Sequence, residues 1–107
     1  MILVFGGTTE GRIAVETLDE GSGKYFYSTG GNLQNIGCAH GEHIHGAMTE
    51  PDMASFCSSN DIRLIIDAAH PFASSLHSTI ERVSHKLGIP VIRFERRYPY
   101  ANYEKIV

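Results

Sequence analysis

The fold is decided by the first twelve residues, which read Met1-Ile-Leu-Val-Phe-Gly-Gly-Thr-Thr-Glu-Gly-Arg12. Residues 2–5 form an apolar run without polar alternation, which is typical of a strand buried on both faces of a parallel sheet. The two glycines end this strand, and a threonine hydroxyl can then cap a helix. A strand, a glycine turn and a helix start together form an arrangement that binds phosphate. Backbone N–H groups and the positive end of the helix dipole point at such a loop.

The glycine loop matches neither of two nucleotide-binding motifs completely. In the dinucleotide fingerprint, with glycines at relative positions one, three and six, Gly6 and Gly11 fill the outer positions and Thr8 the middle one. In the ATP-type loop the two glycines have the required spacing, but Arg12 and Ile13 replace the lysine and the hydroxyl residue. The sequence therefore favours a variant dinucleotide loop, and a glycine turn without a ligand is the alternative. The cofactor-binding residues expected in this loop are Gly6, Gly7, Thr8, Thr9, Glu10 and Gly11.

Length and composition indicate a single ordinary domain. The chain has 107 residues, 42% of them hydrophobic and 20% charged, and a net charge of −3. This charge gives no reason to expect nucleic acid or an anionic membrane as a partner. No apolar run reaches membrane-spanning length, and the start does not resemble a signal peptide. The two cysteines are expected to be reduced thiols, which favours a cytoplasmic protein.

The later elements alternate between strand and helix patterns. Strands are expected at residues 24–28, 42–45, 62–67 and 91–94, and helices at residues 9–19, from residue 49 to about 60, and at 73–87. The expected inner faces are Ile13, Ala14 and Leu18 in the first helix, Met53, Phe56 and Cys57 in the second, and Leu76, Ile80, Val83 and Leu87 in the third. His77 and His85 lie off that last stripe and are expected in solvent. The sequence predicts an α/β fold, Rossmann-like, with an open, doubly wound parallel sheet of about five strands in the order 3-2-1-4-5.

Candidate site residues follow the strands at their carboxyl ends, where α/β sheets bind ligands. Ser28 and Thr29 follow the second strand with no acidic neighbour, which favours NADP over NAD; a plain polar turn is the alternative. His70 stands in the loop after the fourth strand, facing the glycine loop, and could orient a substrate, donate a proton or only stiffen the loop. Cys38, His40, His43 and His45 carry the side-chain types that bind zinc, but their spacing matches no zinc pattern and favours surface histidines.

Three stretches together carry a resemblance to a known family. Gly6-Gly-Thr-Thr-Glu-Gly-Arg12, Asp67-Ala-Ala-His-Pro-Phe-Ala73 and Arg93-Phe-Glu-Arg96 stand in the order and spacing of the precorrin-6A reductase family. The chain resembles the amino-terminal half of such an enzyme. The family usually has a threonine at Ala69, a proline at Arg97 and a basic residue near Asn32, and the last departure weakens the NADP assignment.

The resemblance implies a function in cobalamin biosynthesis. Family members use NADPH to reduce one double bond of precorrin-6A or its cobalt form, in a cleft between two α/β domains. Residues 1–97 would be the dinucleotide-binding domain, and 98–107 a linker or the start of a missing carboxyl-terminal domain, so the chain alone is expected to be inactive. His70 would be catalytic, and the tetrapyrrole substrate would contact His70, Pro71, Phe72, Arg93 and Arg96. A catalytically inactive nucleotide-binding module and a flavodoxin-like interaction domain are the alternatives.

Overall fold

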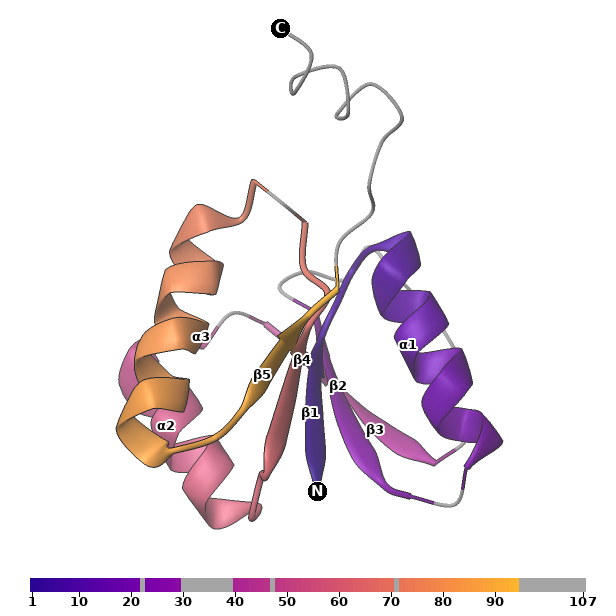
Figure 1. The fold of residues 1–107 in the computed structure, drawn as a ribbon, viewed down its shortest axis with the longest axis horizontal. Helices are drawn as coiled ribbons and strands as arrows, with labels where there is room; N and C mark the ends of the chain where they lie inside the picture. The colour runs from indigo at the N-terminus through magenta and orange to yellow at the C-terminus, as the bar shows by residue number, and fades with distance from the viewer. Residues whose placement is uncertain (22, 30–39, 47, 71, 95–107) are drawn as a thin grey trace, which may run out of the picture.

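A five-stranded parallel sheet with its first strand in the centre forms the frame of the molecule (Figure 1). The computed structural model describes residues 1–21, 23–29, 40–46, 48–70 and 72–94. The strands are β1 (Ile2–Phe5), β2 (Tyr25–Thr29), β3 (Gly41–His45), β4 (Leu64–Asp67) and β5 (Val91–Arg93). They stand in the order β3-β2-β1-β4-β5, and every neighbouring pair is parallel. The predicted fold class and strand order are confirmed.

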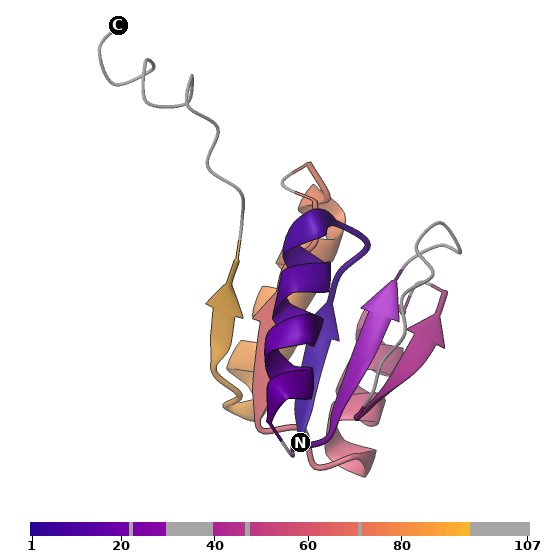
Figure 2. The same cartoon turned by 90° about the vertical axis from the view of Figure 1, so that its right-hand side faces the viewer.

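In the described part of the chain, three helices cover the two faces of the sheet. The helices are α1 (Thr9–Glu20), α2 (Glu50–Ser59) and α3 (Ser74–Leu87). Helix α1 lies on one face, and α2 and α3 lie together on the other (Figures 1 and 2). Each helix connects two parallel strands, so the carboxyl ends of all five strands meet at one edge of the sheet.

The central strand is buried on both faces because alternate side chains enter different cores. Leu3 and Phe5 pack under α2 and α3 with Met53, Ile65 and Ile80, while Val4 packs under α1. Leu3 and Val4 have no exposed surface, and Phe5 is 3% exposed. The unbroken apolar run of the first strand thus follows from two-sided burial.

The ends of the helices carry the caps that the sequence indicates. The Thr8 hydroxyl accepts a hydrogen bond from the N–H of Gly11 at the start of α1. Thr49 does the same for Asp52 at the start of α2, and Gly88 ends α3 in a left-handed conformation with φ 69°. These local signals fix where the chain turns back at each edge of the sheet.

Several details of the elements differ from the prediction. Strand β2 ends one residue later than predicted, at Thr29, and β4 begins two residues later, at Leu64. Ile13 was expected on the inner face of α1, but it is 43% exposed, and Val15 is buried in its place at 1%. The residues of α1 that face the sheet are Gly11, Ala14 and Val15, because Gly11 lies in direct contact with the sheet. The last strand ends at Arg93, although Phe94 still packs against the core under α1. In the described part of the chain, no helix has the length and apolar character needed to cross a membrane.

Candidate functional site

Two loops meet at the carboxyl edge of the sheet. The hydroxyl of Thr8, in the loop between β1 and α1, donates to the carbonyl of Ala68, in the loop after β4, at 2.6 Å. The N–H of Ala68 in turn donates to the carbonyl of Phe5 at 2.8 Å. The sequence placed these loops opposite each other from the strand order alone, and the structure brings them into direct contact.

The glycines of the first loop pack against the ring of Tyr27, which is completely buried. A Cβ at Gly6 would lie 2.3 Å from the Tyr27 Cε1 and 2.4 Å from its hydroxyl oxygen. A Cβ at Gly11 would lie 2.8 Å from the Tyr27 hydroxyl and from the Cα of Gly6. Gly7 has a φ of +98°, a conformation that disfavours any side chain. The glycine spacing therefore has a reason inside the protein, independent of any ligand.

Several N–H groups of this loop already have partners in the chain. Gly6 donates to the carbonyl of Ser28 at 2.9 Å, and Gly7 donates to the Tyr27 hydroxyl at 2.9 Å. The N–H of Gly11 bonds the Thr8 cap at 3.0 Å. These three N–H groups are therefore engaged within the chain, and the positive end of the α1 dipole is the feature of this loop that would attract a phosphate.

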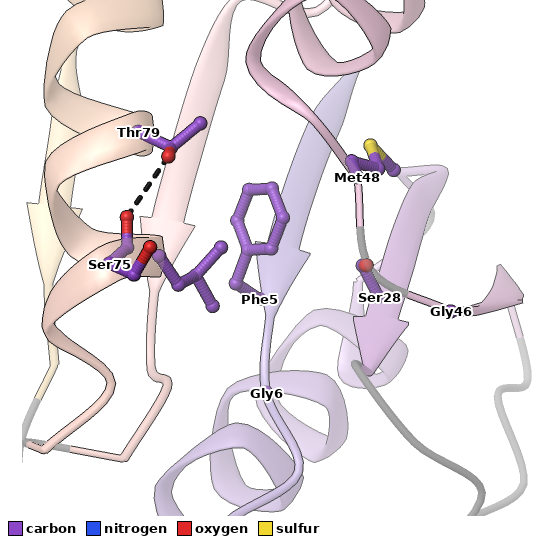
Figure 3. Close-up of a pocket in the computed structure, with 8 residues that line it drawn as sticks. Phe5, Gly6, Ser28, Gly46, Met48, Ser75 and Thr79 are labelled. Carbon is purple, nitrogen blue, oxygen red and sulfur yellow. Dashed lines mark hydrogen bonds between the residues drawn. The ribbon is translucent and has the colours of Figure 1, made fainter.

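A pocket of about 300 Å³ opens beside the glycine loop on the α2–α3 face (Figure 3). Residues of β1, β2, α3 and the segment after β3 line it: Phe5, Gly6, Ser28, Gly46, Met48, Ser75, Leu76 and Thr79. None of these side chains is charged, and three of them carry hydroxyl groups. Such a lining suits an uncharged planar group with a few hydrogen-bonding atoms.

Ser28 and Thr29, predicted together as cofactor residues, point to opposite faces of the sheet. Ser28 faces the pocket beside Phe5 (Figure 3). Thr29 lies on the α1 face, where its methyl group is 4.0 Å from the position of a Cβ at Gly7. Its hydroxyl lies 3.1 Å from His43 Nε2, and the His43 ring is 5.3 Å from that of Tyr27. His43, expected at the surface, is therefore half-buried beside a predicted cofactor residue.

The loop after β4 presents His70 and Phe72 to solvent. The Phe72 N–H donates to His70 Nδ1 at 3.1 Å, and the two rings lie 5.1 Å apart. Phe72 is 86% exposed, which is unusual for so large an apolar side chain. Neither residue lines the pocket. Arg93 is exposed at the end of β5, in register with Asp67, while Pro71 and Arg96 lie outside the described residues.

The prediction for His77 was wrong. His77 is only 5% exposed and its Nδ1 lies 2.5 Å from Oδ2 of Asp67, which is 2% exposed. The apolar stripe of α3 suggested a solvent position, but His77 stands one turn before Ile80 and shares its face. The signal that could have found it is Asp67, a carboxylate ending an apolar strand, since a buried carboxylate needs a partner.

Metal-ligating side chains do not converge in the described part of the chain. Within it, no group of three histidine, cysteine, aspartate or glutamate residues is placed to hold a metal ion. Cys38, the candidate ligand beside His40, His43 and His45, lies outside the described residues.

Comparison with known proteins gives one family. The family model described as precorrin-6x reductase CbiJ/CobK matches residues 1–106. The chain is 30% identical over 106 residues to the cobalt-precorrin-6A reductase of Synechocystis sp., covering 89% of this chain and 38% of that protein. It is 27% identical over 103 residues to the enzyme of the same name from Salmonella typhimurium, covering 94% of this chain and 39% of that one. The chain thus spans well under half the length of these relatives.

A solved structure has the same fold. The chain described as CobK precorrin-6A reductase superposes with a TM-score of 0.81 at 24% identity, covering 90% of this chain and 39% of that one.

Proposed function

Because the chain belongs to the precorrin-6x reductase CbiJ/CobK family, we propose that it is the amino-terminal part of an NADPH-dependent precorrin-6A or cobalt-precorrin-6A reductase. Such an enzyme acts in cobalamin biosynthesis. The observation that carries the proposal is the family match over residues 1–106. In the proposed division, residues 1–97 bind the dinucleotide and residues 98–107 lead into a second domain that completes the active site. The cytoplasmic location stays a prediction from the sequence.

The residues at the carboxyl edge fit one half of a dinucleotide. The pocket's volume of about 300 Å³ is at the small end of the range for ligand sites, about 300–1,000 Å³, so it suits the adenine rather than the whole cofactor. The first turn of α1 would take the phosphates, since its N–H groups and dipole lie beside Gly6 at the pocket's rim. We therefore assign the adenine to the pocket and the pyrophosphate to residues 6–11.

Two residues on the α1 face are candidates for binding the additional phosphate that distinguishes NADPH from NADH. Thr29 and His43 form a polar pair beside Gly7, and an imidazole can donate to a phosphate oxygen. His43 would supply a basic group that the family places in the loop after the second strand, where this chain has Asn32. Calorimetric titration of NADPH and NADH measures the preference, and equal binding of both in the full-length reductase would contradict it.

The substrate side of the site is proposed at the loop after β4 and the end of β5. The chemistry that NADPH supplies when bound is a hydride, so the protein mainly orients the reactants and excludes water. The exposed rings of His70 and Phe72, tilted by 40° to each other, offer an aromatic surface that a macrocycle could contact. Arg93 and Arg96 would pair with its carboxylates, as guanidinium groups do strongly and directionally.

NADPH oxidation tests the function directly. The full-length reductase containing this chain should oxidise NADPH in the presence of precorrin-6A or of its cobalt form, and the two substrates form separate arms. The 107-residue chain alone should not, because its crevice lacks the second wall that hydride transfer requires. No oxidation by the full-length enzyme with either substrate would contradict the proposal, and robust turnover by the isolated chain would contradict the need for a second domain.

A further inference from the structure

A buried acid–histidine pair lies directly under the loop that carries His70. Asp67 ends β4 and His77 lies in the first turns of α3, and their side chains are 3% and 7% exposed. His77 Nδ1 is 2.5 Å from Asp67 Oδ2, and the other carboxylate oxygen accepts the N–H of Ala69 at 3.2 Å. The role of this pair depends on the second ring nitrogen of His77, Nε2, which contacts the His70 loop.

His77 Nε2 holds the backbone of His70. It lies 2.9 Å from the His70 carbonyl oxygen, and a carbonyl only accepts, so Nε2 carries a hydrogen. One further hydrogen lies between Nδ1 and Asp67, whichever of the two atoms it is bonded to. The same carbonyl also accepts the N–H of Ala73 at 2.9 Å. Two donors therefore fix the peptide that carries the His70 side chain.

The ring of His70 is held in one tautomer. Its Nδ1 accepts the N–H of Phe72 at 3.1 Å and therefore carries no hydrogen. In the neutral ring the hydrogen is then on Nε2, the nitrogen away from the backbone. Protonation of Nδ1 would break the bond from Phe72, so this geometry suits a hydrogen-bond donor better than an acid that cycles between two charge states.

We propose that His77, held by Asp67, is a positioning residue that fixes the His70 loop so that His70 offers a neutral Nε2–H to an acceptor group on the substrate. The identity of that substrate, a tetrapyrrole, rests on the proposed function. The tautomers of His70 and His77 do not, and they are measured separately.

Two matched variants separate position from charge. Asp67→Asn keeps the whole arrangement: the amide oxygen accepts from Ala69, the amide N–H donates to His77 Nδ1, and His77 Nε2–H still holds His70. It removes only the charge and the shared hydrogen. Adding His77→Leu to Asp67→Asn removes the contact to the His70 carbonyl without leaving a buried charge unpaired. The two variants therefore differ only at residue 77.

Nitrogen-15 NMR of the histidine rings in the 107-residue chain tests the geometry without any substrate. We expect hydrogen on Nε2 of both His70 and His77 and none on His70 Nδ1. D67N should keep the His70 pattern, and D67N/H77L should average the two His70 tautomers. A hydrogen on His70 Nδ1 in the unaltered chain would overturn the proposal, and this measurement stands even if neither variant folds.

Kinetics of the full-length reductase test the role. D67N should keep kcat and both KM values within about twofold. D67N/H77L should raise the KM for the tetrapyrrole about tenfold and leave the KM for NADPH unchanged. A tenfold change is the effect of losing roughly one hydrogen bond to the substrate. Equal kinetics for the two variants would overturn the proposal, and so would a D67N variant as impaired as the double. Absence of turnover in the unaltered enzyme would instead count against the proposed function.

Discussion

The contact between Gly6 and Tyr27 yields the sharpest prediction, because it separates a packing role for the glycine loop from a ligand role. In Gly6→Ala the new Cβ would lie 2.3–2.6 Å from three atoms of the Tyr27 side chain, namely Cε1, Cζ and the hydroxyl oxygen. That ring is fully buried and its hydroxyl accepts the N–H of Gly7, so moving it would cost further free energy. Overpacking of a core costs about 1–3 kcal/mol, and a clash with three atoms of a rigid ring places this variant near the upper value. We expect a loss of about 3 kcal/mol.

Urea unfolding followed by far-ultraviolet circular dichroism measures this loss, and Gly23→Ala is the matched control. A Cβ at Gly23 meets nothing within 4 Å, so this variant should stay within about 0.5 kcal/mol of the unaltered chain. For a domain of this size, 3 kcal/mol corresponds to a Tm lowered by about 12–24 °C. If Gly6→Ala were as stable as Gly23→Ala, the packing argument would fail.

A double-mutant cycle identifies Tyr27 as the cause. Tyr27→Leu removes all three clashing atoms, together with the bond to Gly7, and is itself destabilising. In that background Gly6→Ala should cost at least about 1.5 kcal/mol less, since residues in contact couple by about 0.5–3 kcal/mol. Additive effects of the two substitutions would mean that Gly6 is constrained by something other than this ring.

Three further predictions concern the thiol, the cofactor and the substrate. Burial raises the pKa of the Cys57 thiol, so the folded state keeps its proton at a pH where the unfolded chain has lost it. The free energy of unfolding should therefore fall as pH rises above about 8.5. Urea unfolding at several pH values should show this decline, and Cys57→Ala should lack it. His43→Ala should weaken NADPH binding about tenfold and leave NADH unchanged by calorimetry, with the exposed His85→Ala as control; equal losses for both nucleotides would refute the assignment. Arg96→Ala in the full-length reductase should raise the KM for the tetrapyrrole about tenfold and leave the KM for NADPH unchanged. A change in the KM for NADPH instead would mean that Arg96 contacts the cofactor and not the substrate.

The frame of the fold was predictable because its signals are local. The apolar run of residues 2–5, the threonine caps and the glycine after α3 each act within a few residues. Parallel strands separated by helices then leave few possible arrangements. The strand order placed the glycine loop and the loop after β4 at the same edge, where Thr8 and Ala68 are bonded.

The details of the site were not predictable, because they depend on contacts between residues far apart in the sequence. Tyr27 was placed in a strand, but no local pattern shows that its hydroxyl would bond Gly7, twenty residues away. Of the three residues predicted on the inner face of α1, Ile13 was wrong for the same reason, since the phase of that face is set by the contact of Gly11 with that ring. His77 was assigned by helical periodicity, which does not reveal a buried carboxylate on the neighbouring strand.

Chemical-shift mapping tests the central claim that the carboxyl edge of this sheet holds a dinucleotide. NADPH is titrated into the nitrogen-15-labelled chain, and amide signals are followed residue by residue. The account predicts the largest shifts at residues 6–11, at Ser28 and Thr29, and at the pocket residues Gly46 and Thr79. Absence of shifts at these positions, or shifts confined to the opposite edge near Lys24, Gly41 and Ile89, would contradict it.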